Sequence, residues 1–159
     1  MKDIDIKKLI DIVHATDIRK NRRSGSSGTQ EFFTPYTIVK HMCDKISEAD
    51  WSNPEKTFLE PSMGDGNFVI FIIYNRIQHG VSWKDALSTL YGVELMSDNV
   101  QETKDRIISL LLEMEIQFDK AEALKIMDHN LVCSDFFKWD FENWKPIEDE
   151  KEPQSVALF

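Results

Sequence analysis

The chain has 159 residues, of which 42% are hydrophobic and 30% charged, and its formal net charge is -9. This length and composition fit one globular domain with a core. No apolar run approaches the ~20 residues of a membrane span, and no signal segment opens the chain, which predicts a cytoplasmic protein that does not enter a membrane. The negative charge disfavours duplex DNA binding by the chain alone, because such binding depends on Lys and Arg.

Residues 1–28 are predicted to form an N-terminal helix and a flexible basic loop, and residues 29–159 a single α/β domain. A helix should begin at Thr34-Pro35, with Thr34 as N-cap and Pro35 as the first helical residue, and run to about Ser47. A linker over 50–56 should then lead to a strand. The cysteines and histidines show no metal-ligand spacing, so we expect no metal site.

The stretch 57–68 organises the rest of the chain. It reads as a short strand that ends on Glu60, followed by a turn containing Gly64 and Gly66. Glycine permits positive φ and close approach of the backbone to a ligand, although ordinary strand-to-helix turns also contain such glycines. The apolar run that follows has strand propensity, but its position after the turn and the glycine stop at Gly80 predict a helix.

Two further predicted strands also end on carboxylates. Glu94 closes a strand at 91–94, and Asp135 closes one at 130–135, with a helix over 97–115 between them. The carboxyl ends of parallel strands share one edge of a sheet, which is where open α/β sheets bind ligands. A single acid at the end of a strand is more often a helix cap. Three acids at the same edge, namely Glu60, Glu94 and Asp135, favour a ligand site.

The pattern differs from a dinucleotide site. Val69 stands where the third glycine of Gly-x-Gly-x-x-Gly would allow close helix packing, and Asp65 in the turn would repel a phosphate. Acidic groups suit a ligand that has ribose hydroxyls, an amino group and a cation but no phosphate. S-adenosylmethionine has all of these.

Four motifs resemble those of N6-adenine DNA methyltransferases. Glu-Pro-Ser-Met-Gly-Asp-Gly-Asn-Phe at 60–68 is similar to the family's first motif, and Glu-Phe-Phe-Thr-Pro at 31–35 to the N-terminal cofactor motif of one group. Val93-Glu94 and Ser-Asp-Phe-Phe at 134–137 resemble the second and third motifs. The resemblance covers roughly residues 18–140 and implies a Rossmann-like S-adenosylmethionine-dependent methyltransferase fold, with a parallel sheet of about four strands and flanking helices.

The resemblance implies a role for each cofactor residue in the N-terminal half of the site. Thr34 and its neighbouring backbone would hold the methionine carboxylate, and Glu60 would face the amino end. Gly64 and Gly66 would let the backbone pass under the cofactor.

For the nucleoside half, the resemblance implies that Glu94 accepts hydrogen bonds from the ribose hydroxyls and Asp135 from the adenine amino group. Phe136 would pack against the ring. Carboxylates only accept hydrogen bonds, and both the ribose hydroxyls and the adenine amino group can donate them. The residues implied to bind S-adenosylmethionine are Phe33, Thr34, Pro35, Glu60, Pro61, Ser62, Gly64, Gly66, Phe68, Glu94, Leu95, Asp135 and Phe136.

The family's catalytic motif, an Asn or Asp followed by Pro-Pro and an aromatic residue, is missing, because no two of the five prolines are adjacent. No catalytic residue is therefore predicted. Residues 155–159 could form a fourth strand, but they end the chain where that motif would begin. Trp139, Phe141 and Trp144 form an aromatic cluster that could stack a nucleobase, although core or interface packing is favoured.

Three functions are open. The chain can be the cofactor-binding portion of an N6-adenine DNA methyltransferase whose catalytic motif and target-recognition region come from elsewhere. It can otherwise be a catalytically silent cofactor-binding or regulatory subunit that acts through protein partners; a nucleotide-binding module of another class is a third reading. The exposed edge of a short sheet predicts a second subunit or a homodimer, with DNA bound only by the assembled enzyme.

Overall fold

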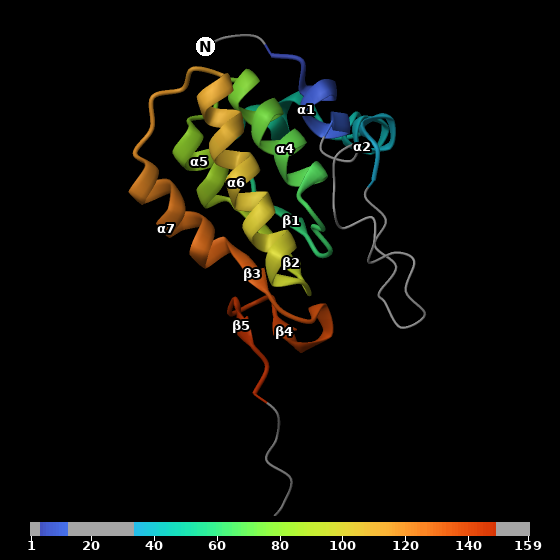
Figure 1. Ribbon diagram of the computed structural model, residues 1–159, viewed down its shortest axis with the longest axis vertical. Helices are drawn as coiled ribbons and strands as arrows, with labels where there is room; N and C mark the ends of the chain where they lie inside the picture. Colours follow the sequence, from blue (N-terminus) through green and yellow to red (C-terminus); the bar gives the residue numbers. More distant parts are fainter. Residues whose placement is uncertain (1–3, 13–33, 149–159) are drawn as a thin grey trace, which may run out of the picture.

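The computed structural model describes residues 4–12 and 34–148. Within those ranges the protein is a mixed α/β structure, in which helices flank a parallel sheet of three strands in the order β1-β2-β3 (Figure 1). The strands are β1 (Phe58–Glu60), β2 (Leu90–Glu94) and β3 (Leu131–Cys133). Both strand pairs are parallel, as predicted.

The helices lie against this sheet and at one end of it. They are α1 (Ile6–Ile12), α2 (Tyr36–Cys43), α3 (Glu48–Ser52), α4 (Asn67–Gln78), α5 (Trp83–Ser88), α6 (Ser97–Glu113) and α7 (Lys120–Asn130). After β3 come the 3-10 helix η3 (Phe136–Lys138) and an antiparallel hairpin of β4 (Trp139–Asp140) and β5 (Lys145–Pro146). Figure 1 shows this hairpin at the lower end of the molecule, far from α1 and α2.

Helix α4 forms from the run that has strand propensity, as its position predicted. Val69, Ile70 and Ile73 are fully buried, and the helix is covered on most of its circumference. Because a helix satisfies its backbone hydrogen bonds internally, it can be apolar all round when it lies in a core. Gly80, with φ of +85°, follows its C-cap. Tertiary context therefore overrides local propensity here.

A buried cation fixes the approach to β1. Arg76 of α4 donates to the backbone oxygens of Asn53 (2.8 Å) and Pro54 (3.2 Å) and to the Thr89 hydroxyl, and its guanidinium lies 5.2 Å from the centre of the Phe58 ring. Burial lowers the pKa of Arg76 from its ordinary value. These bonds hold the start of β1 against α4.

The boundaries near α2 differ from the prediction. Pro35, not Thr34, occupies the N-cap position, and α2 ends at Cys43. Ser47 has extended backbone angles and accepts a hydrogen bond from the Asp50 amide, so it caps α3, which occupies part of the predicted linker. The Ser47 side chain therefore starts a new helix instead of ending the old one.

Helix α1 contributes to the same core as the sheet, since Ile6 and Ile10 are buried in it. The predicted basic loop and the predicted fourth strand at 155–159 lie outside the described residues. Among the described helices, none combines the length and the apolar run needed to cross a membrane.

Two glycines with positive φ provide a matched test of packing at the glycine turn. A Cβ on Gly66 (φ +93°) would lie 2.7 Å from Thr103 of α6, whereas a Cβ on Gly80 (φ +85°) meets nothing within 4 Å. Both alanine variants incur backbone strain, but only Gly66→Ala adds a steric clash. We expect Gly66→Ala to lower the free energy of unfolding by about 1–3 kcal/mol more than Gly80→Ala in urea titrations. Equal losses would contradict this contact.

Candidate functional site

Three carboxylates lie at the carboxyl edge of the sheet. Glu60 ends β1, Glu94 ends β2, and Asp135 follows β3 by two residues. A cleft of about 440 Å³ opens at this edge, a size within the usual range of small-molecule sites. Glu94 and Asp135 line it, whereas Glu60 does not. Its lining consists of Pro61, Ser62, Val93, Glu94, Leu95, Ser134, Asp135, Phe136 and Phe137.

Glu94 holds together the two loops that border the cleft. Its Oε2 accepts a hydrogen bond from the Gly64 amide (2.9 Å), and its Oε1 accepts from the Met96 amide (2.9 Å) and from Asn99 Nδ2 (3.4 Å). The residue is only 9% exposed. Because a carboxylate offers about four acceptor positions, three internal bonds leave about one for a ligand. Glu94 is thus first a structural bridge.

Glu60 is partly buried beside this bridge. Burial raises the pKa of the Glu60 carboxyl above its ordinary value, and a hydrogen bond from the Ser62 amide (3.2 Å) offsets part of that rise. A carboxylate in such a position is stabilised in its charged form by any cation that comes near. The edge of the sheet can therefore attract a positively charged group.

Asp135 begins the wall on the β3 side of the cleft. Its Oδ1 accepts from the Phe137 amide (3.0 Å) and so caps η3, while the Ser134 amide donates to the backbone oxygen of Glu94 (2.9 Å). These bonds place Phe136 and Phe137 in the wall. Phe137 is 84% exposed, which is unusual for a phenylalanine.

The other predicted residues fall into two groups. Asn67 Nδ2 donates to the backbone oxygen of Thr34 (2.8 Å), which joins Thr34 and the N-cap residue Pro35 to the start of α4. The second group is Gly64, Gly66 and Phe68. The two glycines belong to the turn that Glu94 holds, and Phe68 is partly buried against the core. Phe33 lies outside the described residues.

Six predicted residues therefore line the cleft directly: Pro61, Ser62, Glu94, Leu95, Asp135 and Phe136. Val93, Ser134 and Phe137 also line it. They lie in the second and third motifs, but they were not predicted to bind the cofactor. The signal for Phe137 was its place as the second of two aromatic residues after Asp135, the acid at the end of the strand. An aromatic residue in that place is exposed unless another element covers it.

Asp65 does not act as predicted. It is 1% exposed, and its carboxylate lies 3.4 Å from Arg106 Nη1, which also donates to the Asp65 backbone oxygen (2.7 Å). Its charge is therefore compensated inside the protein and does not border the cleft, so it is not the group that would repel a phosphate. The lining itself carries Glu94 and Asp135 and, among the described residues, no Lys or Arg.

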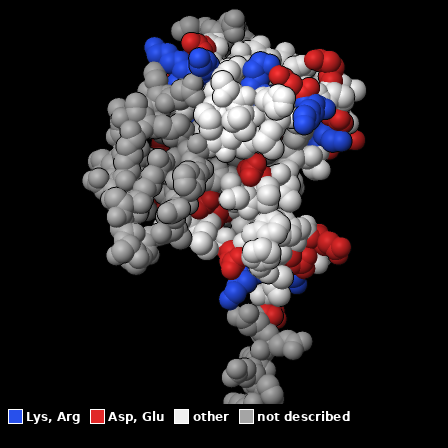
Figure 2. Space-filling view, turned by 90° about the vertical axis from the view of Figure 1, so that its right-hand side faces the viewer, with Lys and Arg blue, Asp and Glu red and all other residues white. Residues whose placement is uncertain are grey.

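The surface charge follows the same pattern. On the face shown in Figure 2, the charged side chains across the middle are carboxylates, while Lys and Arg lie mostly toward the upper end. Together with the net charge of -9, this distribution repels polyanions from the middle of the face.

Fold and site together define a mixed α/β protein with a three-stranded parallel sheet, compatible with a Rossmann-like arrangement, whose cleft lies at the carboxyl edge of the strands. Comparisons with protein-family models, with curated proteins and with solved structures give no match for this chain.

The bridge made by Glu94 can be tested by Glu94→Gln. Glutamine has one acceptor oxygen and one amide donor, so it cannot accept from both the Gly64 and the Met96 amides. We expect the free energy of unfolding in urea to fall by about 1–3 kcal/mol. The control Glu113→Gln, at an exposed position at the end of α6, should change it by less than about 0.5 kcal/mol. A loss no larger than the control's would contradict the bridge.

The raised pKa of Glu60 predicts a pH-dependent effect of Glu60→Gln. A carboxyl whose pKa is raised in the folded state contributes to the stability of the folded protein. This contribution is fully present below the pKa of the unfolded chain, about 4.3, and is lost as pH rises through the pKa of the folded state. Glutamine stays neutral throughout. We therefore expect the variant to be more stable than the wild type at about pH 7, and the difference to close toward about pH 4. Urea titrations at both pH values measure this, and a pH-independent difference would contradict it.

Proposed function

We propose that this chain binds S-adenosylmethionine in the cleft at the carboxyl edge of the sheet, as the cofactor-binding portion of an N6-adenine DNA methyltransferase with a Rossmann-like fold. The observation that carries the proposal is the lining of the cleft. Glu94 and Asp135 meet there with the exposed rings of Phe136 and Phe137. Acceptor-only groups beside aromatic faces suit a nucleoside that has hydroxyl and amino donors.

The residues present fit this cofactor. Asp135 would accept from the adenine amino group while Phe136 or Phe137 packs against the ring, and the remaining acceptor position of Glu94 would take a ribose hydroxyl. The partly buried carboxylate of Glu60 would face the cationic end. Thr34 lies beside the turn through its bond to Asn67, which suits its proposed role at the methionine carboxylate.

When bound, S-adenosylmethionine would supply an activated methyl group. The chain's own residues would bind and orient it, because a methyl transfer depends on positioning. No adjacent prolines are present for the catalytic motif. We therefore expect transfer to DNA only when a second polypeptide that carries this motif and a DNA-binding surface is added.

Calorimetric titration with S-adenosylmethionine tests the binding step. Asp135→Ala should weaken binding by about 1–3 kcal/mol, because a charged hydrogen-bond partner is lost. Asp140→Ala is the matched control: Asp140 also accepts from backbone amides, of Glu142 and Asn143 (both 3.0 Å), but it lies in the hairpin outside the cleft. The control should bind as the wild type does.

Titration with ATP distinguishes the cofactor from a phosphate-bearing nucleotide. The cleft presents carboxylates and, among the described residues, no Lys or Arg, so a triphosphate should bind much more weakly than S-adenosylmethionine. Absence of S-adenosylmethionine binding at millimolar concentration, or ATP binding that is equally tight, would contradict the proposal.

A further inference from the structure

The Phe136 ring lines the cleft, but the turn that carries it is short. Phe136 begins η3, and none of the three residues of η3 is buried. The Phe137 amide donates to Asp135 Oδ1 and the Lys138 amide to the Asp135 backbone oxygen (both 3.0 Å), so the backbone of the turn is held. These bonds do not select a χ1 rotamer for Phe136, because none of them involves its ring. A ring that is 38% exposed therefore needs a contact of its own to keep one orientation.

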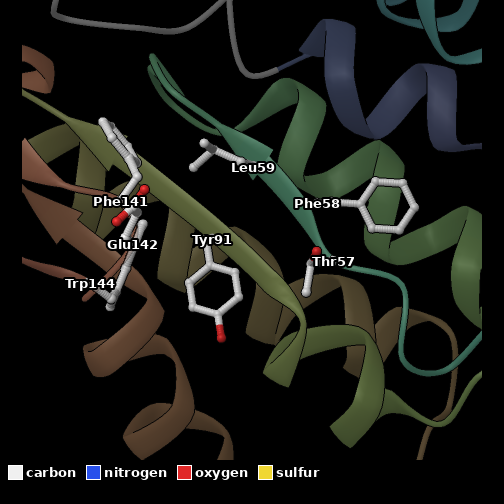
Figure 3. Close-up of a pocket in the computed structure, with 7 residues that line it drawn as sticks. All are labelled: Thr57, Phe58, Leu59, Tyr91, Phe141, Glu142 and Trp144. Atoms are coloured by element: carbon white, nitrogen blue, oxygen red, sulfur yellow. The ribbon is translucent and has the colours of Figure 1, made fainter.

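Phe141 makes such a contact from outside the cleft. Its ring centre lies 4.8 Å from that of Phe136, with 43° between the ring planes. Phe141 does not line the cleft; it lines a groove of about 320 Å³ between the sheet and the hairpin (Figure 3). Phe137 also approaches Phe136, at 5.4 Å, but it is 84% exposed and offers little support. Phe136 thus stands between the cleft on one side and Phe141 on the other.

The turn that carries Phe141 is tied to the sheet. Trp144, in the same turn, packs on Tyr91 of β2 with ring centres 4.7 Å apart, and its Nε1 donates to the backbone oxygen of His129 (2.7 Å). The Phe141 ring lies 6.2 Å from that of Trp144. A continuous row of rings therefore runs from β2 through Trp144 and Phe141 to Phe136.

The hairpin holds this row from a second direction. Strands β4 and β5 pair on either side of the turn. Trp139, which begins β4, is only 9% exposed, and its ring packs on that of Trp144 at 5.4 Å. The cluster of Trp139, Phe141 and Trp144 is therefore a packing element, as the sequence favoured, and one of its rings reaches the wall of the cleft.

We infer that Phe141 is a positioning residue: it holds the Phe136 ring in the orientation against which a nucleoside base packs in the cleft. When a binding-competent orientation is populated only in part, the apparent affinity falls by that fraction. An aromatic pair at this separation shifts such an equilibrium by about two- to tenfold. The identity of the ligand rests on the proposed function, whereas the contact between the two rings does not.

NMR of the full chain without ligand tests the orientation. Three-bond couplings to Cγ of Phe136 report its χ1 rotamer. We expect one rotamer in the wild type, averaged rotamers in Phe141→Leu, which stays apolar but lacks the ring, and one rotamer again in Phe141→Tyr. Averaged rotamers in the wild type overturn the inference even if no variant folds. The same single rotamer in the wild type and in Phe141→Leu also overturns it.

Calorimetric titration with S-adenosylmethionine measures the consequence for binding. Phe141→Leu should raise Kd about two- to tenfold, and Phe141→Tyr should restore it. Phe118→Leu removes the ring that packs on Trp83 at 6.0 Å, away from the cleft, and Asp140→Ala alters the same turn but keeps every ring of the row. Both controls should bind as the wild type does. An equal loss in either control overturns the inference.

A double-mutant cycle separates positioning from a general effect on the fold. In Phe136→Leu the ring to be positioned is gone, so adding Phe141→Leu should weaken binding no further. Losses that multiply overturn the inference. If the rotamer of Phe136 depends on Phe141 as expected but the wild type binds no S-adenosylmethionine, the proposed function fails, while the control of the Phe136 ring by Phe141 stands.

Discussion

The buried carboxylate of Glu94 is the interaction on which the rest of the site depends. It joins the amide of Gly64, in the turn after β1, to the amide of Met96, at the start of α6. Backbone donors at a helix start and in a tight turn otherwise lack partners, and in a buried position an unpaired amide is costly. One side chain satisfies both, and it thereby joins the turn after β1 to the start of α6 at the carboxyl edge of the sheet.

This structural use of Glu94 changes how a ligand could bind. A strand-end acid that already accepts three hydrogen bonds has little capacity left, so recognition of a nucleoside depends more on Asp135 and on the rings of Phe136 and Phe137. Among the described residues, the Asp135 side chain accepts one hydrogen bond, from the Phe137 amide, and this bond caps η3. Glu60, whose charge is held at a cost by burial, is the carboxylate that gains most from a cationic ligand.

In the part of the chain that the structure describes, β1 is an edge of the sheet. The helices and the hairpin cover β2 and β3 better than β1, where Leu59 remains half exposed.

The sequence by itself determined the parallel order of helices and strands and the meeting of three carboxylates at one edge. Periodicity, glycine stops and strand-end acids are local signals, and the parallel connection follows from them. They also indicated that the apolar run at 68–74 is a helix, although its residues favour strands. Six of the residues implied by the resemblance line the cleft.

Only the tertiary structure decided what each charge does. Asp65 reads in sequence as a loop acid that faces a ligand, but Arg106, which lies in α6, removes its charge from the site. Likewise Thr103, distant in sequence, gives Gly66 a packing reason to be glycine. The side chains that compensate a charge or fill a space come from elements far apart in the chain, and no local pattern specifies which of them will meet.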